Sequence, residues 1–100
     1  MMARVRVDGE NREHRVTVYV TSRCAPCKKT RRFLKSRSIE YEYLNLHTAD
    51  PEEREQAMIE FGEHLPRRGR KITYPIIIID ENTVVYGYDE ESLSESLGIR

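Results

Sequence analysis

The chain has 100 residues, enough for one small domain with a single core and too few for a second domain. Its 17 basic and 17 acidic residues cancel, so the chain as a whole lacks the positive field of a general nucleic-acid binder. The first residues are interrupted by charge, and the longest apolar run is residues 76–79, so we expect neither a signal peptide nor a membrane span. These features predict a cytoplasmic domain that binds neither nucleic acid nor membrane.

Residues 1–14 are predicted to be an N-terminal extension, followed by one domain over residues 15–100. Within the extension, Val5 and Val7 alternate with charged residues in the manner of a short strand. If residues 15–20 form a central strand, both edges of that strand are already taken. The extension must then either cross to an outer edge of the sheet or remain a mobile arm, and the sequence leaves both alternatives open.

The two cysteines of the chain, Cys24 and Cys27, follow the predicted strand at residues 15–20 and precede a helical stretch at residues 28–35. A cysteine at the start of a helix lies against unpaired backbone N–H groups and the positive end of the helix dipole. Both stabilise the thiolate, so the cysteine pKa can fall from about 8.5 into the range of roughly 3.5–7.5. The pattern therefore predicts a nucleophilic Cys24 with Cys27 behind it.

Two other interpretations of the cysteine pair fit less well. A structural zinc ion needs four ligands, and the three histidines lack the paired spacing that would complete a site, so we expect no metal. A purely structural disulfide between residues this close closes a loop too small to remove much entropy from the unfolded chain. A redox-active pair is the preferred interpretation, because a cytoplasmic vicinal dithiol is more often catalytic than structural.

The middle of the chain predicts a strand and a helix. Residues 39–46 alternate as a strand does, with tyrosines on one face and acids on the other. Asp50 is a predicted N-cap, Pro51 occupies the first helical position, and glutamates follow, which together form a strong helix start. The expected apolar stripe of this helix consists of Ala57, Met58, Phe61 and Leu65.

The last third predicts a hairpin and a final helix. Residues 76–79 are apolar on both faces, which is typical of a strand covered on both sides. A turn at residues 80–82 leads to a strand at 83–86, and Asp89 caps a helix that ends at Gly98. The predicted fold class is α/β, with the order βαβαββα and a four-stranded mixed sheet flanked by three helices.

The chain resembles the glutaredoxin-like branch of the thioredoxin fold. The resemblance rests on three features in order: the Cys24–Cys27 motif, the stretch of Thr73, Tyr74 and Pro75, and the stretch of Gly87, Tyr88 and Asp89. It implies that Pro75 is cis and faces the dithiol, so that the backbone of Tyr74 can hold an extended substrate. The substrate-binding residues that it implies are Arg23, Pro26, Thr73, Tyr74, Pro75, Gly87, Tyr88 and Asp89.

The residues that carry the resemblance give conflicting indications about glutathione binding. Glutaredoxins that bind glutathione commonly carry a lysine where this chain has Thr21, and Arg23 is the nearest cation. Proline before the second cysteine resembles the thioredoxin motif, and Tyr88 resembles the aromatic residue of compact redoxins that accept electrons from thioredoxin reductase. Against this, Arg70 and Lys71 lie where the family places a cation for the glutathione carboxylate.

The sequence predicts a thiol–disulfide oxidoreductase that reduces protein disulfides through Cys24 and Cys27, with no bound cofactor besides its own redox-active disulfide. Its electron source is either a flavin-dependent thioredoxin reductase or glutathione as co-substrate, and we expect a monomer. One alternative is a glutathione-dependent glutaredoxin, including one that holds an iron–sulfur cluster between two protomers. Another is a redox-sensing binding module that does not turn over.

Overall fold

The computed structural model describes residues 4–62 and 74–99, and its centre is a five-stranded mixed sheet in the order β1-β3-β2-β4-β5. Strand β2 (Val16–Val20) is parallel to β3 (Tyr41–Asn45) and antiparallel to β4 (Ile76–Ile79). Strand β5 (Thr83–Tyr86) pairs antiparallel with β4 through a tight turn. Strands β2 and β4 are buried at every residue because both their faces and both their edges are covered.

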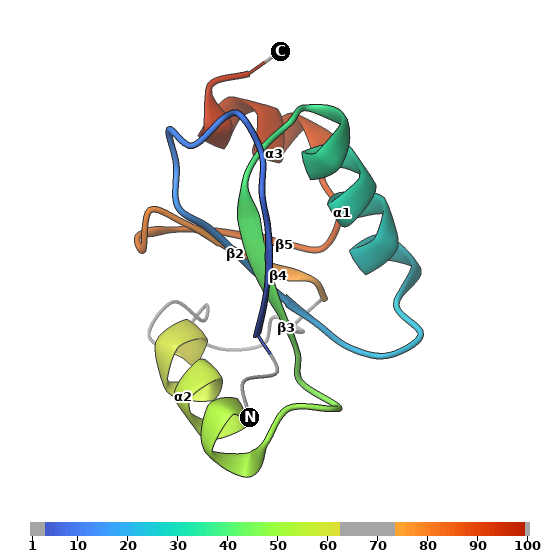
Figure 1. The fold of residues 1–100 in the computed structure, drawn as a ribbon, viewed down its shortest axis with the longest axis vertical. Coiled ribbons are helices and arrows are strands. Elements are labelled where there is room, and N and C mark those ends of the chain that lie inside the picture. The colour runs from blue at the N-terminus through green and yellow to red at the C-terminus, as the bar shows by residue number, and fades with distance from the viewer. Residues whose placement is uncertain (1–3, 63–73, 100) are drawn as a thin grey trace.

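The N-terminal segment takes the first of its two alternatives and crosses to an outer edge. Strand β1 (Arg4–Val7) pairs antiparallel with β3 and forms the fifth strand of the sheet (Figure 1). The chain then turns back past residues 38–40, where the Asn11 N–H donates to the Ser38 carbonyl at 2.8 Å and the Glu40 N–H donates to the Asn11 carbonyl at 3.0 Å. Gly9 lies against this backbone so closely that an added Cβ would be 2.6 Å from the Glu40 nitrogen.

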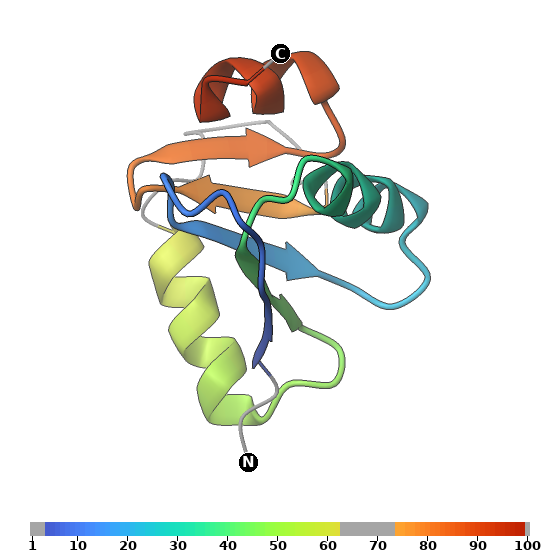
Figure 2. The same ribbon diagram turned by 45° about the horizontal axis from the view of Figure 1, so that its top comes forward.

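Three helices cover the two faces of the sheet. Helices α1 (Ala25–Ser36) and α3 (Glu90–Leu97) lie on one face, and α2 (Pro51–Gly62) lies on the other (Figure 2). None of the described helices is long and apolar enough to span a membrane. The predicted element order is confirmed, with β1 as the added strand.

The helix α2 corrects one expectation from the sequence. Ala57 is fully buried against the sheet as predicted, but Met58 is 55% exposed and the prediction that it is a core residue is wrong. Adjacent helical residues point about 100° apart, so Met58 turns away when Ala57 faces the sheet. The Leu65 position and the side chain of Phe61 fall outside the part of the chain that is described.

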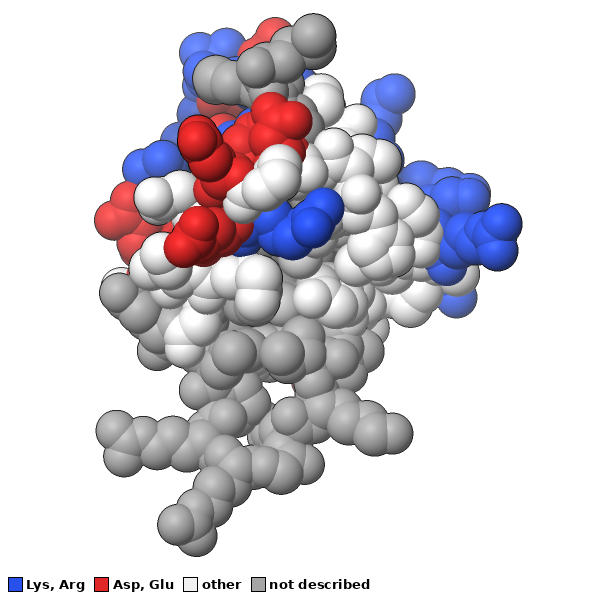
Figure 3. Space-filling view, turned by 90° about the horizontal axis from the view of Figure 1, so that it is seen from below, with Lys and Arg blue, Asp and Glu red and all other residues white. Residues whose placement is uncertain are grey.

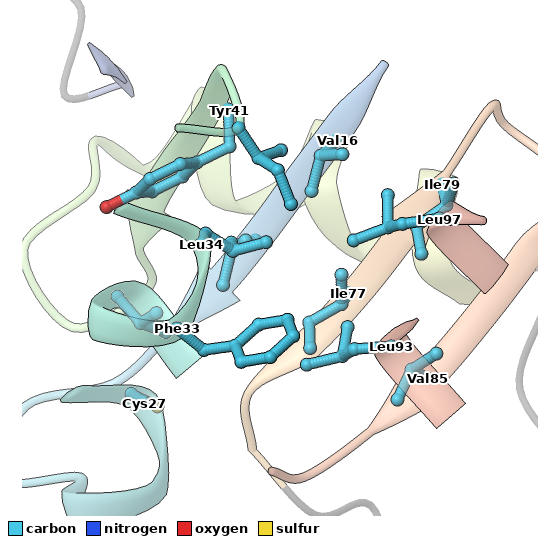
Figure 4. Close-up of a cluster of buried hydrophobic side chains, with 13 residues drawn as sticks. Val16, Cys27, Phe33, Leu34, Tyr41, Ile77, Ile79, Val85, Leu93 and Leu97 are labelled. Carbon is cyan, nitrogen blue, oxygen red and sulfur yellow. The ribbon is translucent and has the colours of Figure 1, made fainter. Parts of the chain in front are cut away.

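The larger hydrophobic core fills the space between the sheet and helices α1 and α3. Leu34 of α1 and Leu93 of α3 are fully buried there, and both pack in one cluster with Ile77 of β4 (Figure 4). Cys27 belongs to the same cluster, at the start of α1. The core therefore fixes the position of α1, and with it the position of the dithiol.

Candidate redox site

Cys24 lies between the end of β2 and the start of α1, and it is the N-cap of that helix. Its Sγ accepts a hydrogen bond from the Cys27 backbone N–H at 3.2 Å. The residue before it, Arg23, has a φ of 59°, a left-handed conformation that turns the chain from the strand into the helix. The helix start thus directs the Cys27 N–H at the Cys24 sulfur, and a backbone donor in this position stabilises a thiolate after reduction.

The two sulfurs form a disulfide but are unequally accessible. Cys24 is partly exposed, whereas Cys27 is only 3% exposed and is packed into the core cluster (Figure 4). Pro26 occupies the first turn of α1, where its missing N–H has no intrahelical partner in any case. The Pro26 carbonyl also accepts a hydrogen bond from the buried Thr30 hydroxyl at 2.9 Å, which fixes the backbone between the sulfurs.

The segment before β4 contains the second motif. The Tyr74–Pro75 peptide bond is cis, the geometry that the family resemblance implied for Pro75. The Pro75 carbonyl accepts a hydrogen bond from the Gly87 N–H at 2.8 Å, which ties this segment to the end of β5. Gly87 has a φ of 72°, a conformation in which glycine is favoured. Two of the sequence motifs are therefore joined directly by a backbone contact.

A hollow of about 590 Å³ brings together four predicted site residues from two motifs: Pro26, Gly87, Tyr88 and Asp89. The Tyr88 hydroxyl donates to a Glu90 carboxylate oxygen at 3.1 Å. Asp89 is the N-cap of α3, and its two carboxylate oxygens accept from the backbone N–H and the hydroxyl of Ser92 at 3.1 and 2.7 Å. The Ser92 backbone N–H, and then its hydroxyl, hold the pKa of Asp89 below its usual range.

Three predicted site residues, Thr73, Arg70 and Lys71, lie outside the residues that the structure describes. Their proposed roles in substrate and anion binding stay predictions. Within residues 4–62 and 74–99, no cluster of three or more His, Cys, Asp or Glu side chains is placed to hold a metal ion.

The sequence analysis missed a second hollow, of about 250 Å³, on the other side of the dithiol. It lies between α1 and β3, and we call it the α1–β3 hollow; both cysteines, Arg23, Arg31 and Tyr43 are among its lining residues. Arg31 lies one helical turn beyond Cys27, so the i, i+4 spacing was the available signal that both residues share a face of α1.

The fold and the site define a class: thioredoxin-fold proteins with a cysteine pair at the start of the first helix. The glutaredoxin family model matches residues 16–84, which is more than half of the chain. The chain belongs to the glutaredoxin family, and the resemblance inferred from the sequence is confirmed. The family model begins at residue 16 and does not test where the domain starts. The predicted division into an extension over residues 1–14 and a domain over residues 15–100 stays a prediction.

Solved structures agree with this assignment. The glutaredoxin of Methanosarcina mazei Go1 is 27% identical, with a TM-score of 0.82 over 97% of this chain and 89% of its own. The methanoredoxin of Methanosarcina acetivorans is 25% identical, with a TM-score of 0.70 over 85% of each chain. The Archaeoglobus fulgidus glutaredoxin is 26% identical, with a TM-score of 0.67 over 85% of this chain and 87% of its own. No curated protein sequence matches the chain.

Proposed function

We propose that this protein is a thiol–disulfide oxidoreductase that reduces protein disulfides and receives its electrons from a flavin-dependent thioredoxin reductase. The observation that carries the proposal is the unequal placement of the two cysteines. Cys24 is partly exposed at the helix N-cap, and Cys27 is buried behind it with its N–H directed at the Cys24 sulfur. This arrangement supports one attacking sulfur and one resolving sulfur.

In the proposed reaction, the Cys24 thiolate attacks one sulfur of the substrate disulfide. A bond forms between that sulfur and Cys24 Sγ, and the other substrate sulfur leaves as a thiolate. The Cys27 thiolate then attacks Cys24 Sγ and displaces the substrate sulfur that is bonded to it, which leaves as the second thiolate. The substrate gains two electrons, and the protein returns to the Cys24–Cys27 disulfide that the structure contains.

The motif residues support the reductase over glutathione as electron donor. Thr21 stands where glutathione-binding glutaredoxins commonly carry a lysine, and Pro26 precedes the second cysteine as in the thioredoxin motif. Tyr88, the residue that resembles the aromatic position of reductase-dependent redoxins, lies beside Asp89 in the hollow near Pro26.

Cysteine variants test the chemistry. With a protein disulfide as substrate and dithiothreitol as electron source, we expect Cys24→Ser to be inactive. Cys27→Ser that has been reduced and then freed of dithiothreitol should accumulate a mixed disulfide with the substrate, visible as a covalent adduct by mass spectrometry. Normal turnover by Cys27→Ser with dithiol-dependent substrates would contradict the roles assigned to the two sulfurs.

Two coupled assays test the electron donor. One contains NADPH and a flavin-dependent thioredoxin reductase, and the other contains NADPH, glutathione and glutathione reductase. We expect turnover in the first assay and a reduction potential of the Cys24–Cys27 pair at or below about −250 mV, closer to thioredoxin than to glutaredoxins. Turnover only with glutathione, together with a potential of roughly −200 to −230 mV, would assign the donor to glutathione instead.

A further inference from the structure

The α1–β3 hollow carries positive charge next to the reactive sulfur. Three cations, Arg23, Lys28 and Arg31, line it together with Cys24 and Cys27, and no Asp or Glu is among its lining residues. The hollow beside Pro26 differs, because Asp89 and Glu90 line it with a single cation, Lys29. The dithiol thus has a basic hollow on its β3 side and a mostly acidic one on its α3 side.

Arg31 is the cation of this hollow whose position is fixed. Its Cζ lies 3.9 Å from the centre of the Tyr43 ring, and its Nε donates to the Tyr41 hydroxyl at 3.4 Å. The terminal guanidinium nitrogens form no ion pair with any residue in the described part of the chain. A guanidinium held by stacking loses little further side-chain entropy when it binds a planar anion, and its fork of N–H donors matches a carboxylate.

The charge around the dithiol is largely uncompensated by the rest of the molecule. Residues 23–37 contain no Asp or Glu, and Arg37 at the end of this stretch forms an ion pair with Glu90 at 4.0 Å. The arginines of β1 are instead paired, Arg4 with Glu42 at 3.0 Å and Arg6 with Glu40 at 2.9 Å. Figure 3 shows Lys and Arg gathered at the right-hand edge of the molecule, the side that α1 occupies in Figure 1, with no Asp or Glu among them. Such a field attracts anionic substrates.

We propose that the α1–β3 hollow binds a carboxylate of the substrate adjacent to its disulfide, with Arg31 as the residue that holds it. This inference rests on the proposed function and adds a substrate class to it, namely disulfides that carry an acidic group near the sulfur. Arg31 acts before the chemical step, by positioning the substrate sulfur near Cys24. The carboxylate can belong to an acidic side chain of a protein or to a small disulfide.

Two chromogenic disulfides separate this role from general reactivity. Dithiobis(nitrobenzoate) carries a carboxylate on each ring, and dithiodipyridine is uncharged. In each case the reduced protein gives up two electrons, forms the Cys24–Cys27 disulfide and releases two aromatic thiols or their tautomers, which absorb strongly. The neutral probe corrects for any change in the reactivity of the Cys24 thiolate, because that change affects both probes.

The test variant is Arg31→Gln, and the matched control is Arg32→Gln, which removes the same charge from the next residue of α1. Arg32 is exposed and does not line the α1–β3 hollow. We expect Arg31→Gln to lower the ratio of the second-order rate constants, dianionic over neutral probe, by about fivefold, as for a partly exposed ion pair. Arg32→Gln should leave this ratio within about twofold of the wild type. Arg31→Lys should recover part of the ratio, because it restores the charge without the planar fork.

An unchanged ratio in Arg31→Gln, or an equal fall in Arg32→Gln, would overturn the proposal. A pair of peptide disulfides with Glu or Gln beside the cysteine identifies the source of the carboxylate. A preference for Glu that Arg31→Gln abolishes assigns the hollow to acidic protein substrates, and a preference confined to the small dianion assigns it to small disulfides. Failure of the proposed function itself would look different, because the wild type would then not reduce a protein disulfide in either coupled assay, whatever its ratio for the two probes.

Discussion

The close packing of Gly9 against residues 38–40 makes Gly9→Ala a sharp test of how the N-terminal strand is held. The added Cβ would lie 2.6 Å from the Glu40 nitrogen and 2.7 Å from the Ile39 carbonyl carbon, and closer still to the Ser38 carbonyl oxygen. All three are backbone atoms, which cannot turn aside as a flexible side chain can. The turn at Gly9 must therefore move away from residues 38–40, and the two hydrogen bonds of Asn11 to this segment are lost.

Two backbone hydrogen bonds at about 0.5–1.5 kcal/mol each predict that Gly9→Ala lowers the free energy of unfolding by about 1–3 kcal/mol. For a domain of this size that corresponds to a fall in Tm of about 5–20 °C. Gly62→Ala is the matched control, because a Cβ at Gly62, in α2, meets nothing within 4 Å. It should raise stability by about 0.5–1 kcal/mol, since alanine loses less backbone entropy in a helix.

The assay is thermal and urea unfolding of the oxidised protein, followed by circular dichroism. Opposite signs for the two glycine variants would support the reasoning. If Gly9→Ala unfolds within about 0.5 kcal/mol of the wild type, the turn is not packed against residues 38–40 as described, and the explanation of how β1 is anchored is wrong.

Three further predictions concern stability. Leu34→Ala should lower the free energy of unfolding by about 2–5 kcal/mol in urea titrations, because Leu34 is fully buried, whereas Lys35→Ala on the exposed face of α1 should change it by less than about 0.5 kcal/mol. Tyr19→Phe should cost about 1–2 kcal/mol in the same assay, because the buried Tyr19 hydroxyl donates to a Glu60 carboxylate oxygen at 2.7 Å; no loss would mean that this bond contributes nothing. The hydrogen bond from His14, and to a lesser extent that from the Arg15 N–H, hold the pKa of Asp80 below its ordinary 3.8. The ionised carboxylate therefore contributes stability above pH 3.8, and this contribution is lost as the pH falls through the lowered pKa. The stability difference between wild type and Asp80→Asn should therefore shrink in acid unfolding experiments below about pH 4, and a constant difference would contradict this reasoning.

The features that the sequence predicted well have local signals. The cysteine pair, the start of α2 after Asp50 and the cap of α3 at Asp89 each depend on neighbours within a few residues. The apolar run at residues 76–79 is a local signal of the same kind, because a strand apolar on both faces must be covered on both.

The features that the sequence left open depend on partners far along the chain. In the pairing of β1 with β3, Val5 lies opposite Tyr43. The N-terminal segment forms a strand and not a mobile arm because β3 has a free edge in the folded sheet, and the sequence does not show that edge. The stacking of Arg31 on Tyr43 depends on how α1 lies across the sheet, which no spacing within either element specifies. The exposure of Met58 is a question of helix rotation, and an apolar residue type alone did not determine it.

The burial of Cys27 has a consequence for the kinetics of the proposed reaction cycle. With Cys27 only 3% exposed, an incoming reductant can reach the disulfide only through Cys24, the same sulfur that attacks the substrate. The substrate disulfide and the reductant must therefore react with Cys24 one after the other and never at the same time. Steady-state rates measured at several concentrations of both partners should give the parallel double-reciprocal lines of a ping-pong mechanism. Intersecting lines would indicate a complex that holds both partners at once.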